Sequence, residues 1–456
     1  MADIARRSLI TREKVGWVLY DWANSAFVLC VITVIGSAYF VELFRSAARQ
    51  AGDLLVGDQP AMAVLGMVLP AASVWSFIVG GSALVVALSS PFLGAIADAA
   101  GARKKFLQTY CLIGVLATLA LWFGLPWWAV GLLILAGNIA FEGGNVFYNA
   151  FLPDIASPAE QDMVSSAGYA AGYVGGVLVL IISLFVFILP SRDVHTPFLL
   201  IGLWWGGFAL VAFALLREQP GRTSPRSGGN LTSEAWRELK TTARNVRNYP
   251  QAALFLVAFL LYNYGVMTII TNATPFALDN IYVDRSLSAK VEMTHLIPAI
   301  IIVQLIAVPG SFFCAWLATR FGEKPAIYFT LVVFTAVVAY GQVIEILSEF
   351  YVMAMLIGVV LGGVQAISRS VFASLIPRGK NAEFFAFFAL SGKFSAVVGP
   401  FIYGLSVWLA GSTRIALLSL VIFFVLGGAI LYFVDLAAGR EQALAAGNGA
   451  TLDGKR

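Results

Sequence analysis

The sequence predicts an all-α membrane protein with twelve transmembrane helices in two repeated halves. The first observation is composition: 59% of the 456 residues are hydrophobic and 12% are charged, against about 45–50% apolar and about 25% charged residues in soluble proteins. The second is that the apolar residues form blocks long enough to cross a hydrocarbon core of about 30 Å. The third is a set of motifs that recurs along the chain. Together they exclude a soluble enzyme, a disordered chain and a nucleic-acid-binding domain.

Each apolar block is expected to form one membrane span, because a helix rises about 1.5 Å per residue. The expected spans are 15–41, 73–97, 106–125, 127–152, 163–189, 197–216, 251–279, 292–318, 325–345, 350–376, 382–410 and 414–435. The apolar stretch 60–72 contains Pro70. It is expected either to extend the second span outward or to lie on the membrane.

The distribution of Lys and Arg predicts the orientation. If both termini are cytoplasmic, the inner segments carry 21 of these residues and the outer segments carry 6. Positive charge accumulates on the cytoplasmic side. We therefore expect a multi-pass protein with both termini in the cytoplasm, located in the plasma (inner) membrane if the source is a bacterium.

The chain is expected to divide at one long polar segment. The expected parts are a six-helix bundle over 1–216, a cytoplasmic linker over 217–250, a second six-helix bundle over 251–436 and a cytoplasmic tail over 437–456. The second part of the linker has apolar residues on one helical face and basic residues around it. This pattern predicts an amphipathic helix that contacts anionic lipids, with a soluble surface helix as the alternative.

Three motifs recur at a nearly constant separation. The segment from Gly94 to Arg103 matches the segment from Ala315 to Lys324, and Pro153, which ends one apolar block, matches Pro377. The third pair is Gly175-Gly176 with Gly399-Pro400. The separation of 221–224 residues implies two six-helix halves in parallel repeat.

These features resemble the major facilitator superfamily, whose motif in the loop between the second and third spans reads Gly-x-Leu-Ala-Asp-Arg-x-Gly-Arg-Lys. The gating-motif residues that match are Gly94, Ala97, Asp98, Gly101 and Arg103. Ala99 and Ala102 replace basic residues of the motif. The segments 20–27, 149–153 and 362–370 are similar to the vacuole-effluxer branch, which includes the yeast vacuolar amino-acid effluxer involved in autophagy. The resemblance implies a transporter whose halves rock around a site at the membrane midplane.

Two acidic residues are expected inside the spans of the first half. Charge in a membrane core is costly and therefore needs a function or a partner. Asn24 lies on or near the same helical face as Asp21. Asp21 is expected to bind a proton or a substrate ammonium group, or else to form a structural hydrogen bond. Glu142 lies in a polar stripe that lipid cannot satisfy. The stripe comprises Asn138, Glu142, Asn145 and Asn149. The alternatives for Glu142 are a proton or substrate site and an interhelical hydrogen-bond ladder.

Two basic residues are expected inside the spans of the second half. Arg369, beside Gln365, suits bidentate binding of a carboxylate or phosphate, and an ion pair to Asp21 or Glu142 is the alternative. Lys393 is expected to pair with an acid or to bind an anion. The other candidate lining residues are Tyr169, Tyr173, Asn263 and Tyr264, for which ordinary packing is the alternative.

No nucleotide-binding loop or catalytic constellation is present in the sequence, so we expect no enzyme. Cys30, Cys111 and Cys314 lie inside apolar blocks, and His195 and His295 lie far apart, so we expect no metal site and no cofactor. The functional hypothesis is a monomeric secondary active transporter of a small metabolite, with amino acids as the first guess and protons as the coupling ion. A drug/proton antiporter and a lipid-handling, flippase-like protein are the alternatives. No nucleic-acid partner is expected.

Overall fold

The computed structural model describes residues 11–52, 54–99, 101–156, 160–218, 249–284, 289–376 and 397–453. In this part of the chain, eleven helices are long and apolar enough to span a membrane. A shorter apolar helix, Val397–Ala410, lies where the eleventh span is predicted. The predicted count of twelve spans is therefore matched. The central linker helix and Lys393 lie outside the described residues.

The first six spans are built from helices that are mostly continuous. The first span is one 39-residue helix, Arg12–Gln50, longer at both ends than predicted. It consists of α2 (Arg12–Phe27), a π-helical segment (Val28–Val34) and α3 (Ile35–Gln50). The following elements are α4 (Ala71–Ala99), α5 (Arg103–Ala120), a 3-10 turn (Leu121–Phe123), α6 (Trp127–Ala150), α7 (Leu152–Ile155), α8 (Gln161–Ile182), a second π-helical segment (Ser183–Ile188), α9 (Leu189–Ser191) and α10 (Thr196–Leu215).

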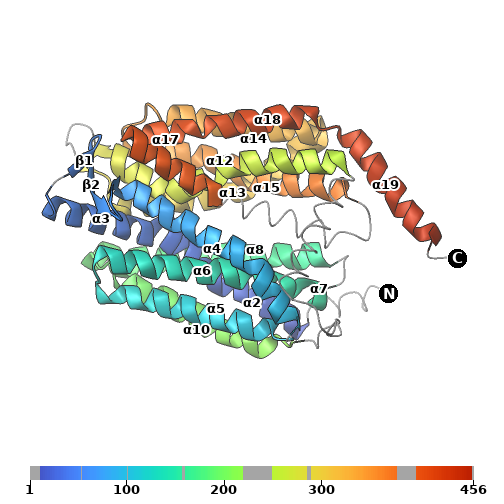
Figure 1. Cartoon of the computed structure of the whole chain (residues 1–456), viewed down its shortest axis with the longest axis horizontal. Helices are drawn as coiled ribbons and strands as arrows, with labels where there is room; N and C mark the ends of the chain where they lie inside the picture. Colours follow the sequence, from blue (N-terminus) through green and yellow to red (C-terminus); the bar gives the residue numbers. More distant parts are fainter. Residues whose placement is uncertain are drawn as a thin grey trace. The chain divides into compact units, whose positions relative to one another are not determined.

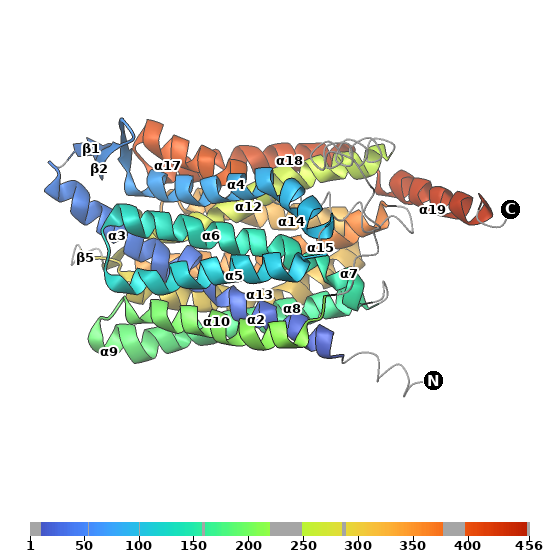
Figure 2. The same cartoon turned by 60° about the horizontal axis from the view of Figure 1, so that its bottom comes forward.

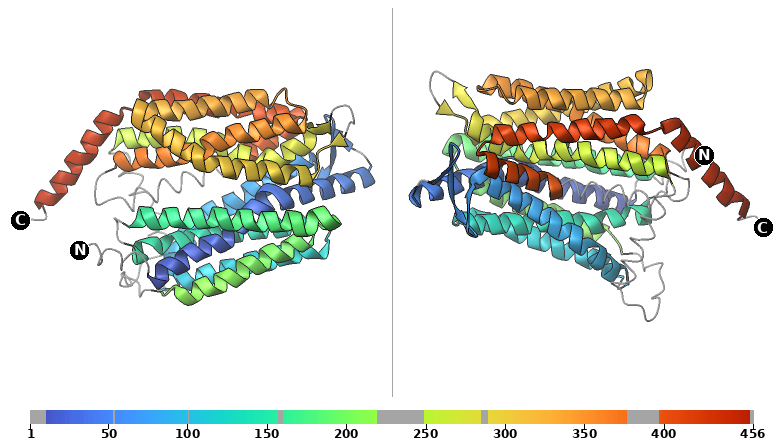
Figure 3. Two further views of the ribbon diagram at one scale, coloured as in Figure 1. Left: turned by 180° about the vertical axis from the view of Figure 1, so that it is seen from behind. Right: turned by 45° about the horizontal axis from the view of Figure 1, so that its top comes forward.

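The second half repeats this helical pattern. Its elements are α12 (Pro250–Asn280), β4 (Tyr282–Asp284), β5 (Ala289–Lys290), α13 (Met293–Phe321), α14 (Glu323–Tyr340), α15 (Leu347–Ser374), the helix Val397–Ala410, α17 (Thr413–Ser419), α18 (Val421–Phe433) and α19 (Leu436–Asp453). The strands β4 and β5 pair antiparallel. The helix α19 continues beyond α18 as the red helix that leads to the C-terminus (Figure 3).

The chain forms two compact units. One contains Met1–Asp53, Gly81–Ala235 and Glu292–Ile297, and the other contains Leu54–Gly80, Trp236–Val291 and Pro298–Arg456. In the first unit α5 packs against α6 and α10 (Figure 1), and α2 packs against α8 and α10 (Figure 2). In the second unit α12 packs against α18, and α14 packs against α15 (Figure 1).

Small residues allow large aromatic side chains to fill the core of each unit. In the first unit Trp205 and Phe27 are buried. Gly114 faces the Trp205 ring, and a Cβ on Gly137 would lie 3.0 Å from the Phe27 ring. Because lipid offers no hydrophobic drive for helix association, such close packing is a main source of cohesion between membrane helices.

Most of the apolar stretch 60–72 forms strands and does not extend the helix of the second span, which begins at Ala71. The strands β1 (Leu54–Val56), β2 (Gln59–Val64) and β3 (Met67–Pro70) make an antiparallel sheet in chain order. Leu65 and Gly66 both have positive φ and join Val64 to its partner Met67. This two-residue turn matches the twist of a hairpin. That the stretch lies on the membrane stays a prediction.

The start of α4 is held by polar and aromatic contacts within the second unit. Ser73 Oγ donates to Gly404 O at 2.8 Å, and Ser76 Oγ donates to Asn272 Oδ1 at 2.7 Å. The rings of Phe77 and Phe401 lie 5.6 Å apart. These contacts join the N-terminal end of α4 to α12 and to the helix Val397–Ala410.

A disulfide tests this arrangement. A Cβ at position 404 would lie 3.0 Å from the Ser76 Cβ, which is slightly closer than the Cβ separation of about 3.5–4.5 Å in disulfides, so a small outward shift of either helix allows the bond. We expect the double variant Ser76→Cys, Gly404→Cys to lose both introduced thiols after mild oxidation, as measured by thiol titration. The buried native cysteines should stay unreactive, and each single variant should keep its thiol. Persistence of both thiols in the double variant would contradict the packing described.

Candidate functional site

A polar cluster joins α2 and α6 in the first unit. Asn24 is buried, and its Nδ2 donates to Asn145 Oδ1 at 3.1 Å. Asp21, three residues earlier, is half-buried and shares a face with Asn24 because of the helical spacing. The structure therefore brings together three of the predicted site residues.

The polar stripe of α6 extends from this cluster. Asn138 is buried, and its Nδ2 donates to Ser82 Oγ on α4 at 2.5 Å. Glu142 and Asn145 are half-buried, and Asn149 is exposed. The interhelical hydrogen bonds proposed as the alternative thus exist at Asn138 and Asn145. The exposure increases toward Asn149, which leaves part of the stripe accessible.

Tyr148 is a cluster residue that the sequence analysis missed. Its ring stacks on Trp17 with centroids 4.3 Å apart, and Trp17 Nε1 donates to Tyr148 O at 3.0 Å. The Tyr148 side chain also lies beside the Asp21 carboxyl. Its position three residues after Asn145, on the polar face of α6, was the signal that could have identified it.

Glycines on α8 allow the polar face of α2 to approach. A Cβ on Gly168 would lie 2.9 Å from Asp21 Oδ2, and a Cβ on Gly172 would overlap with Ser25 Oγ. The predicted lining residues Tyr169 and Tyr173 alternate with these glycines and are 49% and 55% exposed. Thus the glycines of α8 pack against α2, whereas Tyr169 and Tyr173 remain about half exposed.

The candidates of the second unit are less clustered. The Tyr264 hydroxyl donates to Val398 O at 2.8 Å, and its ring stacks on Phe423 at 4.0 Å. These contacts match the packing alternative, so Tyr264 is not carried into the proposed site. Asn263 is buried, Gln365 is half-buried and Arg369 is exposed.

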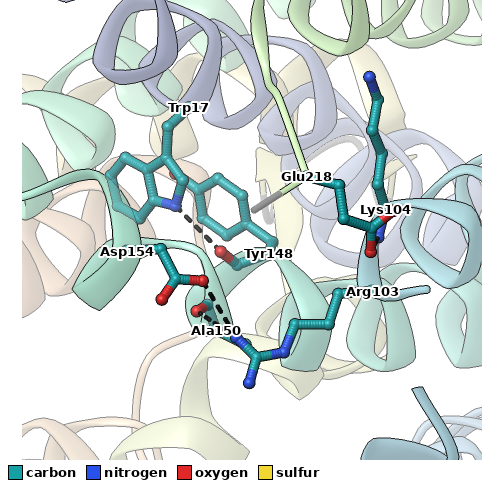
Figure 4. Close-up of polar contacts among 7 residues, drawn as sticks. All are labelled: Trp17, Arg103, Lys104, Tyr148, Ala150, Asp154 and Glu218. Carbon is teal, nitrogen blue, oxygen red and sulfur yellow. Dashed lines mark hydrogen bonds and ion pairs between the residues drawn. The ribbon is translucent and has the colours of Figure 1, made fainter. Parts of the chain in front are cut away.

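The gating motif lies at one end of the first unit. Gly94 lies on α4, and Gly101 has a φ of 57°, which favours glycine. Asp98 also lies on α4, but its side chain is outside the described part. Arg103 Nη1 contacts Asp154 Oδ2 at 3.0 Å and Ala150 O at 3.5 Å (Figure 4). Arg103 therefore ties the start of α5 to the end of α6 and to α7.

The lysine after Arg103 caps a helix end, and the repeat preserves this contact. Lys104 Nζ donates to Leu216 O at 2.7 Å. Its backbone N donates to Glu218 Oε1 at 3.0 Å, and Figure 4 shows these two residues. In the second half, Lys324 Nζ donates to Val434 O at 2.7 Å. A cation at a helix C-terminus satisfies carbonyls that lack a helical partner. The sequence repeat pairs Lys324 with Arg103, and the structure shows that Lys104, one residue later, makes the corresponding contact.

Comparison with known proteins identifies the family. The family model described as "Vacuole effluxer Atg22 like" matches residues 11–444. The chain belongs to this family. The uncharacterized MFS-type transporter YxiO of Bacillus subtilis is 32% identical over 436 residues, covering 93% of this chain and 95% of that protein. Autophagy-related protein 22-1 of Penicillium rubens is 26% identical over 562 residues, covering 97% and 93%.

Solved structures share the fold at low sequence identity. A mutant of the nucleoside transporter NupG superposes with a TM-score of 0.65 at 15% identity, covering 94% of this chain and 99% of that chain. The human organic anion transporter MFSD10 gives 0.57 at 17% identity, with 93% and 99% covered. The chain therefore has the major facilitator fold. The family match and the relative named an MFS-type transporter make it an MFS-type transporter and not an enzyme, as the sequence predicted.

The contact between α2 and α8 can be tested at one glycine. We expect Gly172→Ala to reduce the free energy of unfolding by about 1–3 kcal/mol, the usual effect of overpacking, because the new methyl group meets Ser25 Oγ. The thermal midpoint in detergent measures this loss. Gly207→Ala on α10 is the matched control, because its Cβ would have no neighbour within 4 Å.

The double variant Gly172→Ala, Ser25→Ala should recover part of the midpoint, because it removes the hydroxyl that the methyl group meets. Equal midpoints for the two glycine variants would show that the close approach does not exist.

Proposed function

We propose that this transporter carries amino acids by secondary active transport, coupled to protons, with alternating access to a midplane site. The observation that carries the proposal is the separation of charge between the halves. Asp21 and Glu142 lie in spans of the first half, and Arg369 and Lys393 lie in the second half of the sequence. Opposite charges on two halves suit a zwitterion, whose ammonium and carboxylate need opposite partners.

In this proposal Glu142 is the proton-coupling residue. It is half-buried on α6, between Asn138 and Asn145, both of which make interhelical hydrogen bonds. A carboxyl group in a membrane span can change its charge by taking up a proton, which lowers the cost of moving through an apolar environment. Arg369 is exposed on α15 and would bind the substrate carboxylate, helped by Gln365 and Lys393.

The names of relatives support movement of a small molecule out of a vacuole. The family description is "Vacuole effluxer Atg22 like". Export from a vacuole lumen corresponds topologically to uptake across a bacterial plasma membrane. We therefore propose cytoplasmic termini and, if the source is a bacterium, a plasma-membrane location. We further propose a monomer and a domain division at the 217–250 linker, whose basic helix would contact anionic lipid.

Proteoliposome uptake tests the proposed function. A pool of radiolabelled amino acids is offered with and without an imposed pH gradient. We expect the gradient to stimulate uptake, and Glu142→Gln to reduce the stimulated rate roughly tenfold or more, about 1.4 kcal/mol. Glu441→Gln on α19, where the carboxylate is exposed, is the matched control and should transport normally.

Other outcomes separate the alternatives. Uptake that changes with neither the pH gradient nor Glu142→Gln would support an amino-acid carrier and would contradict proton coupling at Glu142. No uptake of any amino acid by folded protein would count against this substrate class. Drug efflux or lipid transfer would then be measured in the same vesicles.

A further inference from the structure

Asp21 is an acidic residue in a membrane span without a basic partner among the described side chains. The ion pairs of the first unit join other residues, such as Lys14 with Glu160 and Arg103 with Asp154. Asp21 belongs to the first span and is half-buried. A carboxylate in such a place needs a proton or a cation to offset its charge.

Two buried side chains near Asp21 have an acceptor left over among the described residues. Asn24 Oδ1 has no partner, because the amide bonds Asn145 through Nδ2. The Tyr148 hydroxyl lies against the Asp21 carboxyl, and its oxygen accepts no hydrogen bond. Both residues are buried, at 1% and 4% exposure. Buried polar atoms are rarely left unsatisfied, so these acceptors beside one carboxyl indicate a ligand.

The other two such atoms are the indole nitrogens of Trp22 and Trp205. They are donors and cannot bind a cation, so they take no part in the proposed subsite.

Aromatic rings border the same place. Tyr148 stacks on Trp17, and the Tyr20 ring lies 5.2 Å from the Tyr148 ring. Aromatic faces attract cations, with a larger effect where water is excluded. The surroundings of Asp21 thus combine a carboxylate, an amide oxygen, a phenol and aromatic rings.

A glycine of the adjacent helix leaves room for the carboxyl group. A Cβ on Gly168 would lie 2.9 Å from Asp21 Oδ2 and 2.7 Å from the Trp17 ring. The carboxyl group therefore lies close to α8 at a position that has no side chain.

We propose that Asp21, Asn24 and Tyr148 form the subsite for the ammonium group of an organic substrate. An ammonium group has three N–H donors, and the three side chains supply three acceptors: the carboxylate, the amide oxygen and the phenol oxygen. A proton on Asp21 would remove the charge but would supply a single O–H donor, whereas an ammonium group supplies three N–H donors. This inference rests on the proposed function and assigns Asp21 to the substrate, which leaves proton coupling to Glu142.

The test measures binding of an amine directly. Purified protein in detergent is titrated by calorimetry with n-butylamine and with n-butanol, which has the same chain without the charge. We expect binding of the amine only, lost at least 100-fold in Asp21→Asn and weakened roughly tenfold in Tyr148→Phe and Asn24→Leu. Asp58→Asn, in an exposed turn, and Tyr432→Phe, on an exposed ring, are the matched controls and should bind normally.

A second measurement uses transport. Uptake of a radiolabelled amino acid found in the proteoliposome screen is competed with its decarboxylated amine and with its α-hydroxy acid. The amine should compete and the hydroxy acid should not, and Asp21→Asn should abolish the difference. Unchanged thermal midpoints would show that the variants are folded.

The outcomes distinguish this inference from the proposed function. Amine binding that needs Asp21, in a protein that transports no amino acid, would support the subsite and overturn the substrate class. Amine binding that survives in Asp21→Asn, together with loss of gradient-driven uptake, would make Asp21 the proton site and overturn the inference. Absence of amine binding to the unmodified protein would also overturn it.

Discussion

The close contact between α2 and α8 is the constraint on which the first unit depends. Asp21, Asn24 and Ser25 place a carboxyl, an amide and a hydroxyl on a helix that must cross lipid, where an unsatisfied polar group costs several kcal/mol. Protein must cover that face. The glycines of α8 at 168 and 172 allow the helix backbone to do so, and the amide of Asn145 on α6 supplies a partner from the other side. The polar face of one helix is therefore tolerated because its neighbours bring either no side chain or a matching one.

The spans were predictable because lipid imposes a simple rule on every one of them: about 20 apolar residues with few charges. The polar candidates were predictable for the same reason, since Asp21 and Glu142 stand out against an apolar background. Tyr148 and Trp17 did not stand out, because aromatic residues are common in membrane helices and their stacking depends on how two distant helices meet. The strands at 54–70 were missed because their turn includes Leu65 at positive φ, a conformation that its residue type does not signal.

The two halves share a lysine contact at the ends of corresponding spans and differ in the sign of the charges within the spans. Lys104 and Lys324 cap the last carbonyls of corresponding spans, so this contact is a property of the repeated scaffold. The ion pairs beside them differ: Arg103 pairs with Asp154 after α6, whereas Glu323 pairs with Arg440 from α19. In the span cores the difference becomes one of sign, with acids in the first half and bases in the second. A repeated fold can hold different side chains in its two halves. The helix ends of both halves need the same capping contacts, whereas the residues at the span centres can differ according to the ligand.

A charge argument connects the proposed ammonium subsite to energy coupling. With substrate bound, the ammonium group offsets the Asp21 carboxylate, and the loaded site is close to neutral. Without substrate, the bare carboxylate opposes any movement that leaves it in an apolar environment. The charge of Asp21 is thus offset by the substrate, and the charge of Glu142 on α6 is offset by the coupling proton, so both carboxyl groups are neutralised only when substrate and proton are bound together. Coupling would follow from two carboxyl groups with different partners: Asn24 and Tyr148 beside Asp21, and the polar stripe of α6 around Glu142.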